Sequence, residues 1–180
     1  MRDLLAYLIN IVFSFLVWAL LLRLIFQLVK TNFRNPLAQA VVKLTNPLIV
    51  PLRRVLPPIG RVDTASVVAL LLTQAVEIVL VRWVGGFGLP SAEGLLVATL
   101  VALVRQTVTF LLFATIIWAV LSWIVTDQRS PAGEALSDII EPLLRPIRRV
   151  MPRLEGLDLS PMVLCVLLGL MLKLLEQLGL

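Results

Sequence analysis

Apolar residues along the chain gather in four long stretches, separated by polar segments that are rich in proline and arginine. Each stretch carries at most one charge, and the four cover residues 4–29, 64–81, 106–126 and 159–175. A helix needs roughly 20 mostly apolar residues to cross about 30 Å of hydrocarbon. The pattern therefore predicts four membrane-spanning helices, over about 4–29, 64–83, 96–125 and 159–177.

A polar signature occurs twice, 95 residues apart. NPLIVPLRRVLPPIGRVD, at 46–63, is matched without a gap by EPLLRPIRRVMPRLEGLD, at 141–158. The shared polar and proline positions are Pro47/Pro142, Pro51/Pro146, Arg53/Arg148, Arg54/Arg149, Pro57/Pro152 and Asp63/Asp158. Such spacing indicates a duplicated structural unit. We expect a first repeat over 1–85 and a second over 86–180.

The fold class follows from the order of these segments. With 59% hydrophobic residues and a mean hydropathy of +1.00, the chain is more apolar than a soluble domain, for which about 45–50% is usual. We predict an all-α membrane protein with four transmembrane helices in two parallel two-helix repeats. Most basic residues lie in the two signature loops, so the positive-inside bias makes these loops cytoplasmic and places both termini outside.

Each signature loop begins with a helix-start signal. Asn35-Pro36 and Ser130-Pro131 place an N-capping residue before a proline, a residue tolerated at the first helical position. Apolar residues at 37, 40, 41 and 44, and again at 132, 135, 136, 139 and 140, predict a short amphipathic helix in each loop. The prolines that follow should interrupt it and favour a stiff, extended segment.

The charged residues of the loops have several interpretations. Asp63 is placed to cap the helix after it, and if Ser160 caps the last helix, Asp158 is free to bind the arginines of its own loop. We expect an Arg–Asp bridge that braces the loop. The arginine pairs could otherwise contact anionic lipid, dock a soluble cytoplasmic partner, or line a substrate or ion path.

Two charges fall inside the predicted spans, Glu77 and Lys173. Both lie roughly 21–23 Å from the loop end of their helix, at about 1.5 Å per residue. They either reach the outer interface by extending along the helix or meet as an ion pair between the repeats. The connection at 86–105 either lies along the outer surface or extends a tilted, protruding third helix.

Catalysis finds little support. The chain has no histidine and a single cysteine, Cys165, which lies in an apolar stretch. No glycine-rich phosphate loop and no metal-ligand spacing is present. The sequence predicts a protein that is not an enzyme and that has no cofactor and no metal site.

The second signature, EPLLRPIRRVMPRLEGLDLSP with SWIVTDQRSP before it, resembles the YggT (YlmG) family of small membrane proteins. The first copy departs from the pattern at 64–66 and 27–28. The resemblance implies a bacterial inner-membrane location. It also implies an association with osmotic tolerance and potassium uptake, with cell division and envelope organisation, and in plastids with nucleoid distribution and cytochrome maturation.

Two functions are compatible with these features. In the first, the protein organises the membrane, with its paired basic loops holding anionic lipids, neighbouring copies or a soluble partner, and without direct contact to nucleic acid. In the second, it is part of an ion-handling system and lines a path only as an oligomer, because four helices rarely enclose a pore alone.

Overall fold

The computed structural model describes residues 1–180 except 32–33, 59–62, 125–129, 151–157 and 178–180. Within these described residues the secondary structure is entirely helical. The helices are α1 (Arg2–Val29), α2 (Pro36–Arg53), α3 (Thr64–Gly85), α4 (Ala92–Ile124), α5 (Pro131–Val150) and α6 (Ser160–Gln177). Four of them, α1, α3, α4 and α6, are long and apolar enough to cross a membrane. The predicted all-α class with four apolar spans is confirmed.

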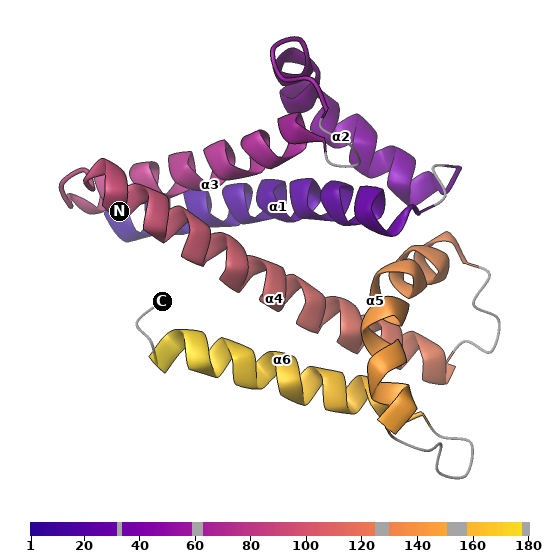
Figure 1. The fold of residues 1–180 in the computed structure, drawn as a ribbon. Coiled ribbons are helices and arrows are strands. Elements are labelled where there is room, and N and C mark those ends of the chain that lie inside the picture. Colours follow the sequence, from indigo (N-terminus) through magenta and orange to yellow (C-terminus); the bar gives the residue numbers. More distant parts are fainter. Residues whose placement is uncertain (32–33, 59–62, 125–129, 151–157, 178–180) are drawn as a thin grey trace.

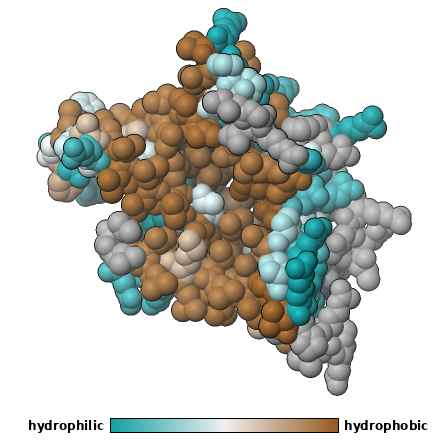
Figure 2. Space-filling view, viewed as in Figure 1, coloured by the Kyte–Doolittle hydropathy of each residue, from teal (hydrophilic) through white to brown (hydrophobic). Residues whose placement is uncertain are grey.

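The four long helices lie side by side, and α2 and α5 lie across one end of them (Figure 1). In the first half of the chain α1 packs along α3, and α2 contacts both; in the second half α4 packs along α6, and α5 contacts both. Met1 and the end of α6 lie at the opposite end of the molecule (Figure 1). Apolar side chains cover the middle of the visible face, and hydrophilic ones gather toward its ends (Figure 2).

Helices α2 and α5 begin where the cap signals predict. The Asn35 side chain accepts a hydrogen bond from the Leu37 N–H at 2.9 Å, and the Ser130 hydroxyl accepts one from the Gly133 N–H at 3.1 Å. Each bond satisfies a donor that the first helical turn cannot pair internally. These two starts depend on local chemistry alone, which is why the sequence reveals them.

The extended segment expected after these starts was wrong. Helix α2 continues through Pro47 and Pro51, and α5 continues through Pro142 and Pro146. All four prolines lie on the exposed side of their helix. A carbonyl that loses its helical partner there can bind water or a lipid headgroup, so the missing N–H does not end the helix.

The buried face holds α2 in place across its prolines. Its buried residues are Ala38, Val41, Thr45 and Ile49. Of the predicted apolar stripe of α2, Val41 is buried and residues 37, 40 and 44 are exposed. The predicted stripe of α5 is confirmed at Ala135, Ile139 and Ile140, which are buried. Pro57 lies after α2 and its carbonyl accepts a hydrogen bond from Thr64 at 2.7 Å, whereas Pro152 lies outside the described residues.

The path of residues 86–105 is settled by α4, a continuous helix of 33 residues. At 1.5 Å per residue this helix is about 50 Å long, well beyond a bilayer core of about 30 Å. It runs obliquely between α1 and α6 (Figure 1). The third span is therefore part of one continuous helix that begins at Ala92, and 95–104 do not form a separate segment. The break before it lies at Gly86, whose φ of 78° caps α3 in the left-handed conformation.

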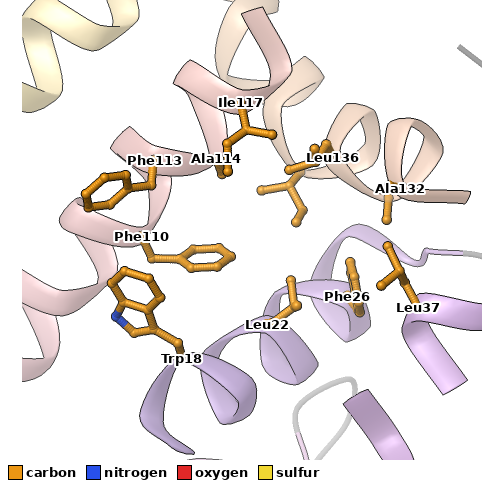
Figure 3. Close-up of a pocket in the computed structure, with 12 residues that line it drawn as sticks. Trp18, Leu22, Phe26, Leu37, Phe110, Phe113, Ala114, Ile117, Ala132 and Leu136 are labelled. Atoms are coloured by element: carbon orange, nitrogen blue, oxygen red, sulfur yellow. The ribbon is translucent and has the colours of Figure 1, made fainter. Parts of the chain in front are cut away.

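The two halves meet through apolar side chains. Trp18 of α1 packs edge-on against Phe110 of α4, with ring centroids 6.0 Å apart. A cavity of about 310 Å³ lies next to this contact, between α1, α4 and α5, and its lining is apolar throughout. Leu37 and Ala132, from the first turns of α2 and α5, close one side of the cavity (Figure 3).

Candidate functional site: the paired arginine–aspartate clusters

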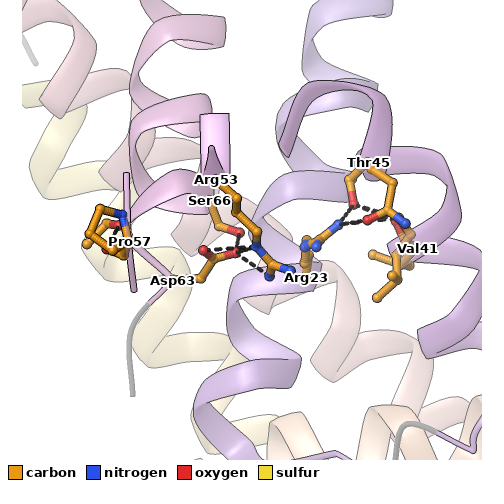
Figure 4. A network of polar contacts seen from close by, with 10 residues as sticks. Arg23, Val41, Thr45, Arg53, Pro57, Asp63 and Ser66 are labelled. Carbon is orange, nitrogen blue, oxygen red and sulfur yellow. Dashed lines mark hydrogen bonds and ion pairs between the residues drawn. The ribbon is translucent and has the colours of Figure 1, made fainter. Parts of the chain in front are cut away.

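In the first half, the end of α2 brings Arg53 to the carboxylate at the start of α3. Arg53 Nη2 lies 2.7 Å from Asp63 Oδ2, and its Nε donates to both carboxylate oxygens at 3.2 and 3.3 Å. Ser66 Oγ donates to the same carboxylate at 2.6 Å (Figure 4). Asp63 occupies the N-cap position, as predicted, but its carboxylate binds these side chains and no backbone N–H of α3.

The second half repeats the bridge with one more carboxylate. Arg148 Nη2 lies 2.6 Å from Asp158 Oδ2, and its Nη1 lies 2.7 Å from Glu141 Oε1. The guanidinium also lies over the Trp118 ring, 5.8 Å from its centroid. Both expected Arg–Asp bridges are therefore present.

The last helix is capped by Asp158, and not by Ser160 as the sequence suggested. Its Oδ1 accepts a hydrogen bond from the Ser160 N–H at 3.0 Å, while Ser160 is already the first residue of α6. Asp158 thus binds the helix start and Arg148 at once. The carboxylate has four lone-pair sites, which is enough for both.

Both aspartates are held in the ionised form. Burial raises the pKa of Asp63, but hydrogen bonds from Arg53 and Ser66 outweigh burial and hold the pKa below its usual value. Burial likewise raises the pKa of Asp158, and hydrogen bonds from Ser160 and Arg148 lower it further than burial raises it. The bridges are therefore intact at neutral pH.

A third arginine, which the sequence did not single out as a site residue, lies beside the first bridge. Arg23 of α1 is only 7% exposed. Its Nη1 donates to Thr45 Oγ1 at 2.7 Å, to Asn46 Oδ1 at 3.0 Å and to the Val42 carbonyl at 3.3 Å. This guanidinium therefore ties α1 to the middle of α2 (Figure 4).

The 95-residue offset relates the two clusters but exchanges their polar groups. Arg23 corresponds to Trp118, and Asn46 corresponds to Glu141. The first cluster has two arginines and one carboxylate, and the second has one arginine and two carboxylates. The first therefore carries one net positive charge and the second one net negative charge. When the two repeats are aligned at the 95-residue offset, Arg23 is a charge opposite a tryptophan, and this difference could have singled it out from the sequence.

The second arginine of each pair has a different environment from the first. Arg54 and Arg149 are exposed. The side chain of neither forms an ion pair or a hydrogen bond with a residue that the structure describes. One arginine of each pair therefore braces the loop, and the other is presented outward.

The predicted pair of intramembrane charges was wrong. Glu77 and Lys173 do not meet, because α3 and α6 are not in contact. Lys173 is exposed. Glu77 is buried among the helices, with 4% of the residue exposed, and accepts a hydrogen bond from Gln74 at 2.9 Å. Helix α4 packs against both α3 and α6.

Four apolar helices in two like repeats, each braced at one end by an Arg–Asp bridge, define a multi-pass membrane protein. The described residues contain no group of three or more His, Cys, Asp or Glu that could hold a metal ion. The sequence matches the family model described as CCB3/YggT over residues 3–84 and 97–179. The chain belongs to the CCB3/YggT family.

Curated relatives agree with this assignment. The chain is 40% identical over 166 residues to "Uncharacterized protein YggT" of Escherichia coli (strain K12), covering 91% of this chain and 85% of the relative. It is 38% identical over 173 residues to "Uncharacterized protein PA0392" of Pseudomonas aeruginosa, covering 96% of this chain and 86% of the relative. A protein of Vibrio alginolyticus is 34% identical over 162 residues, 89% of this chain and 87% of the relative. No solved structure matches the chain.

Proposed function

We propose that this protein is a non-enzymatic component of the bacterial inner membrane that binds anionic lipid headgroups and so organises the membrane around it. The signature loops face the cytoplasm in this proposal, and the termini face the periplasm. The lipid phosphate binds at Arg54 and Arg149, while Arg53 and Arg148 hold the loops in shape.

The main support for the proposal is that one arginine of each pair binds an aspartate, while the other is exposed and has no carboxylate partner. A guanidinium that is exposed and free of a carboxylate offers a planar set of donors that suits a phosphate. Arg54 follows α2 and Arg149 lies in the last turn of α5, the two helices across the end of the spans. A cation in this position contributes about 1 kcal/mol to binding an anionic lipid surface.

The apolar surroundings of these arginines fit the same ligand. Leu44, Leu48 and Val50 of α2 are exposed large apolar residues, as expected for a helix at a membrane interface. The apolar cavity between the repeats is bordered by the first turns of α2 and α5 (Figure 3). It provides space for an acyl chain at the opposite ends of α2 and α5 from Arg54 and Arg149.

The test is lipid-dependent thermal unfolding of the purified protein in mild detergent. Phosphatidylglycerol or cardiolipin should raise the unfolding temperature, and phosphatidylcholine should not. The double variant Arg54→Gln/Arg149→Gln should bind anionic lipid with an affinity about thirtyfold lower, because two contacts of about 1 kcal/mol are lost.

A matched control removes two exposed cations from the other end of the molecule, Arg2→Gln and Lys173→Gln, and should keep the lipid effect. Equal stabilisation of both double variants would refute the lipid site. Loss of a co-purifying soluble protein with an unchanged lipid response would instead assign the two arginines to a protein partner.

A second candidate function is participation in ion homeostasis, for example as an oligomeric ion pathway. One observation favours it, the burial of Glu77 within the spans. Ion flux into proteoliposomes of the purified protein, compared with empty vesicles, tests this function. Flux above that of empty vesicles, lost in Glu77→Gln, would support it.

A further inference from the structure

A groove lies between α2 and α3, at the end of α2 that carries the arginine pair. It has a volume of about 300 Å³. Pro47 and Pro51, with the leucine after each, line it from α2, and Ala69, Leu72 and Thr73 line it from α3. These side chains belong neither to the Arg–Asp bridges nor to the apolar cavity between the repeats.

The groove is hollow because small residues form its floor. Ala69 is 3% exposed and Thr73 is 8% exposed, whereas Leu72 beside them is 52% exposed. The side chains of the lining are apolar except that of Thr73, whose hydroxyl donates to the Ala69 carbonyl at 2.7 Å. The only side-chain donor of the lining is therefore already paired, and the groove suits an apolar group.

The position of the groove along α3 matches the depth of a lipid tail. Ala69 and Thr73 lie about 8–14 Å along the axis from the first residue of α3, Thr64, at 1.5 Å per residue. In a span that crosses a hydrocarbon core of about 30 Å, this stretch falls in the half nearest the signature loops. An empty void forfeits van der Waals contacts, so an acyl chain that reaches the groove gains contacts by filling it.

A cation without a carboxylate partner lies at the end of the groove. Arg54 follows Pro51 by three residues, and its backbone is still helical, with φ of −69° and ψ of −25°. Residues three or four apart share one face of a helix. Arg54 therefore lies on the face of α2 that lines the groove, as does the exposed Lys43, four residues before Pro47. A phosphate at this face and an apolar chain in the groove are the two parts of one phospholipid.

The second half of the chain keeps the walls of this groove but fills its floor. The prolines of α5 stand at the equivalent positions, 95 residues later. Leu164 takes the place of Ala69, and both are buried. Leu168 takes the place of Thr73. These two leucines belong to a buried apolar cluster against which the apolar neighbours of the α5 prolines pack, so the chain's own side chains occupy the equivalent space.

We propose that the groove between α2 and α3 holds one acyl chain of an anionic phospholipid whose phosphate binds Arg54, so that each protein chain has one such lipid site, in its first half. This inference rests on the lipid-binding function proposed above. It adds the position of the lipid tail and a difference between the two exposed arginines. Arg149 contacts headgroups alone, because the space behind it is filled.

The test is native mass spectrometry of the full-length protein in mild detergent, titrated with dioleoyl phosphatidylglycerol. One lipid per chain should bind more tightly than all later ones. Ala69→Leu/Thr73→Leu copies the floor of the second half and should lower the affinity for this first lipid at least tenfold. Arg54→Gln should lower the same affinity about fivefold, a larger loss than in Arg149→Gln. The matched control, Ala40→Leu, enlarges an exposed alanine of α2 outside the groove and should bind as the wild type does.

A single substitution, Thr73→Leu, keeps the test decisive if the double variant does not fold. The Thr73 hydroxyl bonds only within its own helix, so this change fills part of the floor without removing a bond between helices. It should lower the affinity for the first dioleoyl lipid at least threefold. Dihexanoyl phosphatidylglycerol, whose short chains fill little of the groove, should bind equally well to the wild type and to Thr73→Leu. Equal binding of the dioleoyl lipid to both would overturn the proposal.

The outcomes separate this inference from the function on which it rests. If the variants with a filled groove bind the dioleoyl lipid as the wild type does, while Arg54→Gln/Arg149→Gln binds it weakly, the groove proposal is wrong and the lipid function stands. If the double arginine variant also binds as the wild type does, both are wrong. A disulfide between two copies of the Leu72→Cys/Cys165→Ser chain in oxidised membranes, together with unchanged lipid affinity in Thr73→Leu, would assign the groove to a second copy and overturn the proposal.

Discussion

Replacing Arg53 with alanine removes the cation that compensates a buried carboxylate. Asp63 is 2% exposed and would keep only its hydrogen bond from Ser66. Breaking a buried pair by removing one partner costs about 3–5 kcal/mol, mainly because the other charge remains buried. Arg53 itself is 49% exposed, so solvent already screens part of the attraction. We expect a loss near the low end of that range, about 3 kcal/mol.

The second substitution, Asp63→Asn, should restore part of this stability. It removes the carboxylate charge that has lost its hydrogen-bonded cation in the Arg53→Ala variant, and it keeps an oxygen that can accept from Ser66. The remaining cost is that of imperfect hydrogen bonding, about 1–2 kcal/mol. The double variant Arg53→Ala/Asp63→Asn should therefore be more stable than Arg53→Ala alone, by about 1–2 kcal/mol.

Thermal unfolding in mild detergent, followed by circular dichroism, measures these differences. For a chain of 150–250 residues, 1 kcal/mol corresponds to about 2–4 °C, so Arg53→Ala should unfold about 6–12 °C below the wild type. The matched control is Arg54→Ala, one residue away and without a described partner. Its change should stay within about 0.5 kcal/mol, as for most surface substitutions.

The order of the variants decides whether this account is right. If Arg53→Ala and Arg54→Ala lose equal stability, the bridge contributes nothing specific. If the double variant is less stable than Arg53→Ala, the carboxylate is stabilising without its arginine, and the argument from buried charge fails.

Three further results are expected. Asp63 and Asp158 have folded pKa values below the unfolded value of about 3.9, so their stabilisation is complete above about pH 5 and is lost as pH falls through the folded pKa. Between pH 3 and pH 7 the unfolding temperature of the double variant Asp63→Asn/Asp158→Asn should vary less than that of the wild type. Pro146→Ala restores a helical N–H on an exposed face and should stabilise α5; a drop in unfolding temperature would contradict the continuous helix. Thr45→Val leaves Arg23 without its shortest hydrogen bond and should lower the free energy of unfolding by about 1–3 kcal/mol. Denaturant titration measures this difference, and an unchanged free energy of unfolding would show that the bond does not stabilise the protein.

The spans and helix starts could be predicted because they depend on nearby residues. Hydropathy over about 20 positions identifies a span. The Asn35 and Ser130 side chains cap their helices by accepting a hydrogen bond from a backbone N–H two or three residues later. The Arg–Asp bridges could be anticipated for a related reason. The partners are only ten residues apart in each loop, and an unpaired carboxylate at a membrane surface needs a cation.

The prolines and the spanning charges needed tertiary structure. Whether a proline ends a helix depends on which face it occupies. The sequence does not show which side of α2 faces outward, so Pro47 was expected to interrupt the helix. Glu77 was expected at the interface from its depth alone. Its burial follows from the position of α4, whose Gln106 supplies part of its surroundings, and no local pattern encodes that packing.

The exchange of polar groups between the clusters limits how the two repeats could be recombined. Arg23 needs the neutral acceptors of α2, while Trp118 tolerates the acidic Glu141 on α5 because Arg148 lies between them. A single helix moved from one repeat into the other would meet the wrong partner, either a guanidinium without an amide or a carboxylate without a guanidinium. The smallest segment that could be transplanted intact is therefore a whole repeat, and the two halves, although built alike, have become complementary parts rather than spare copies.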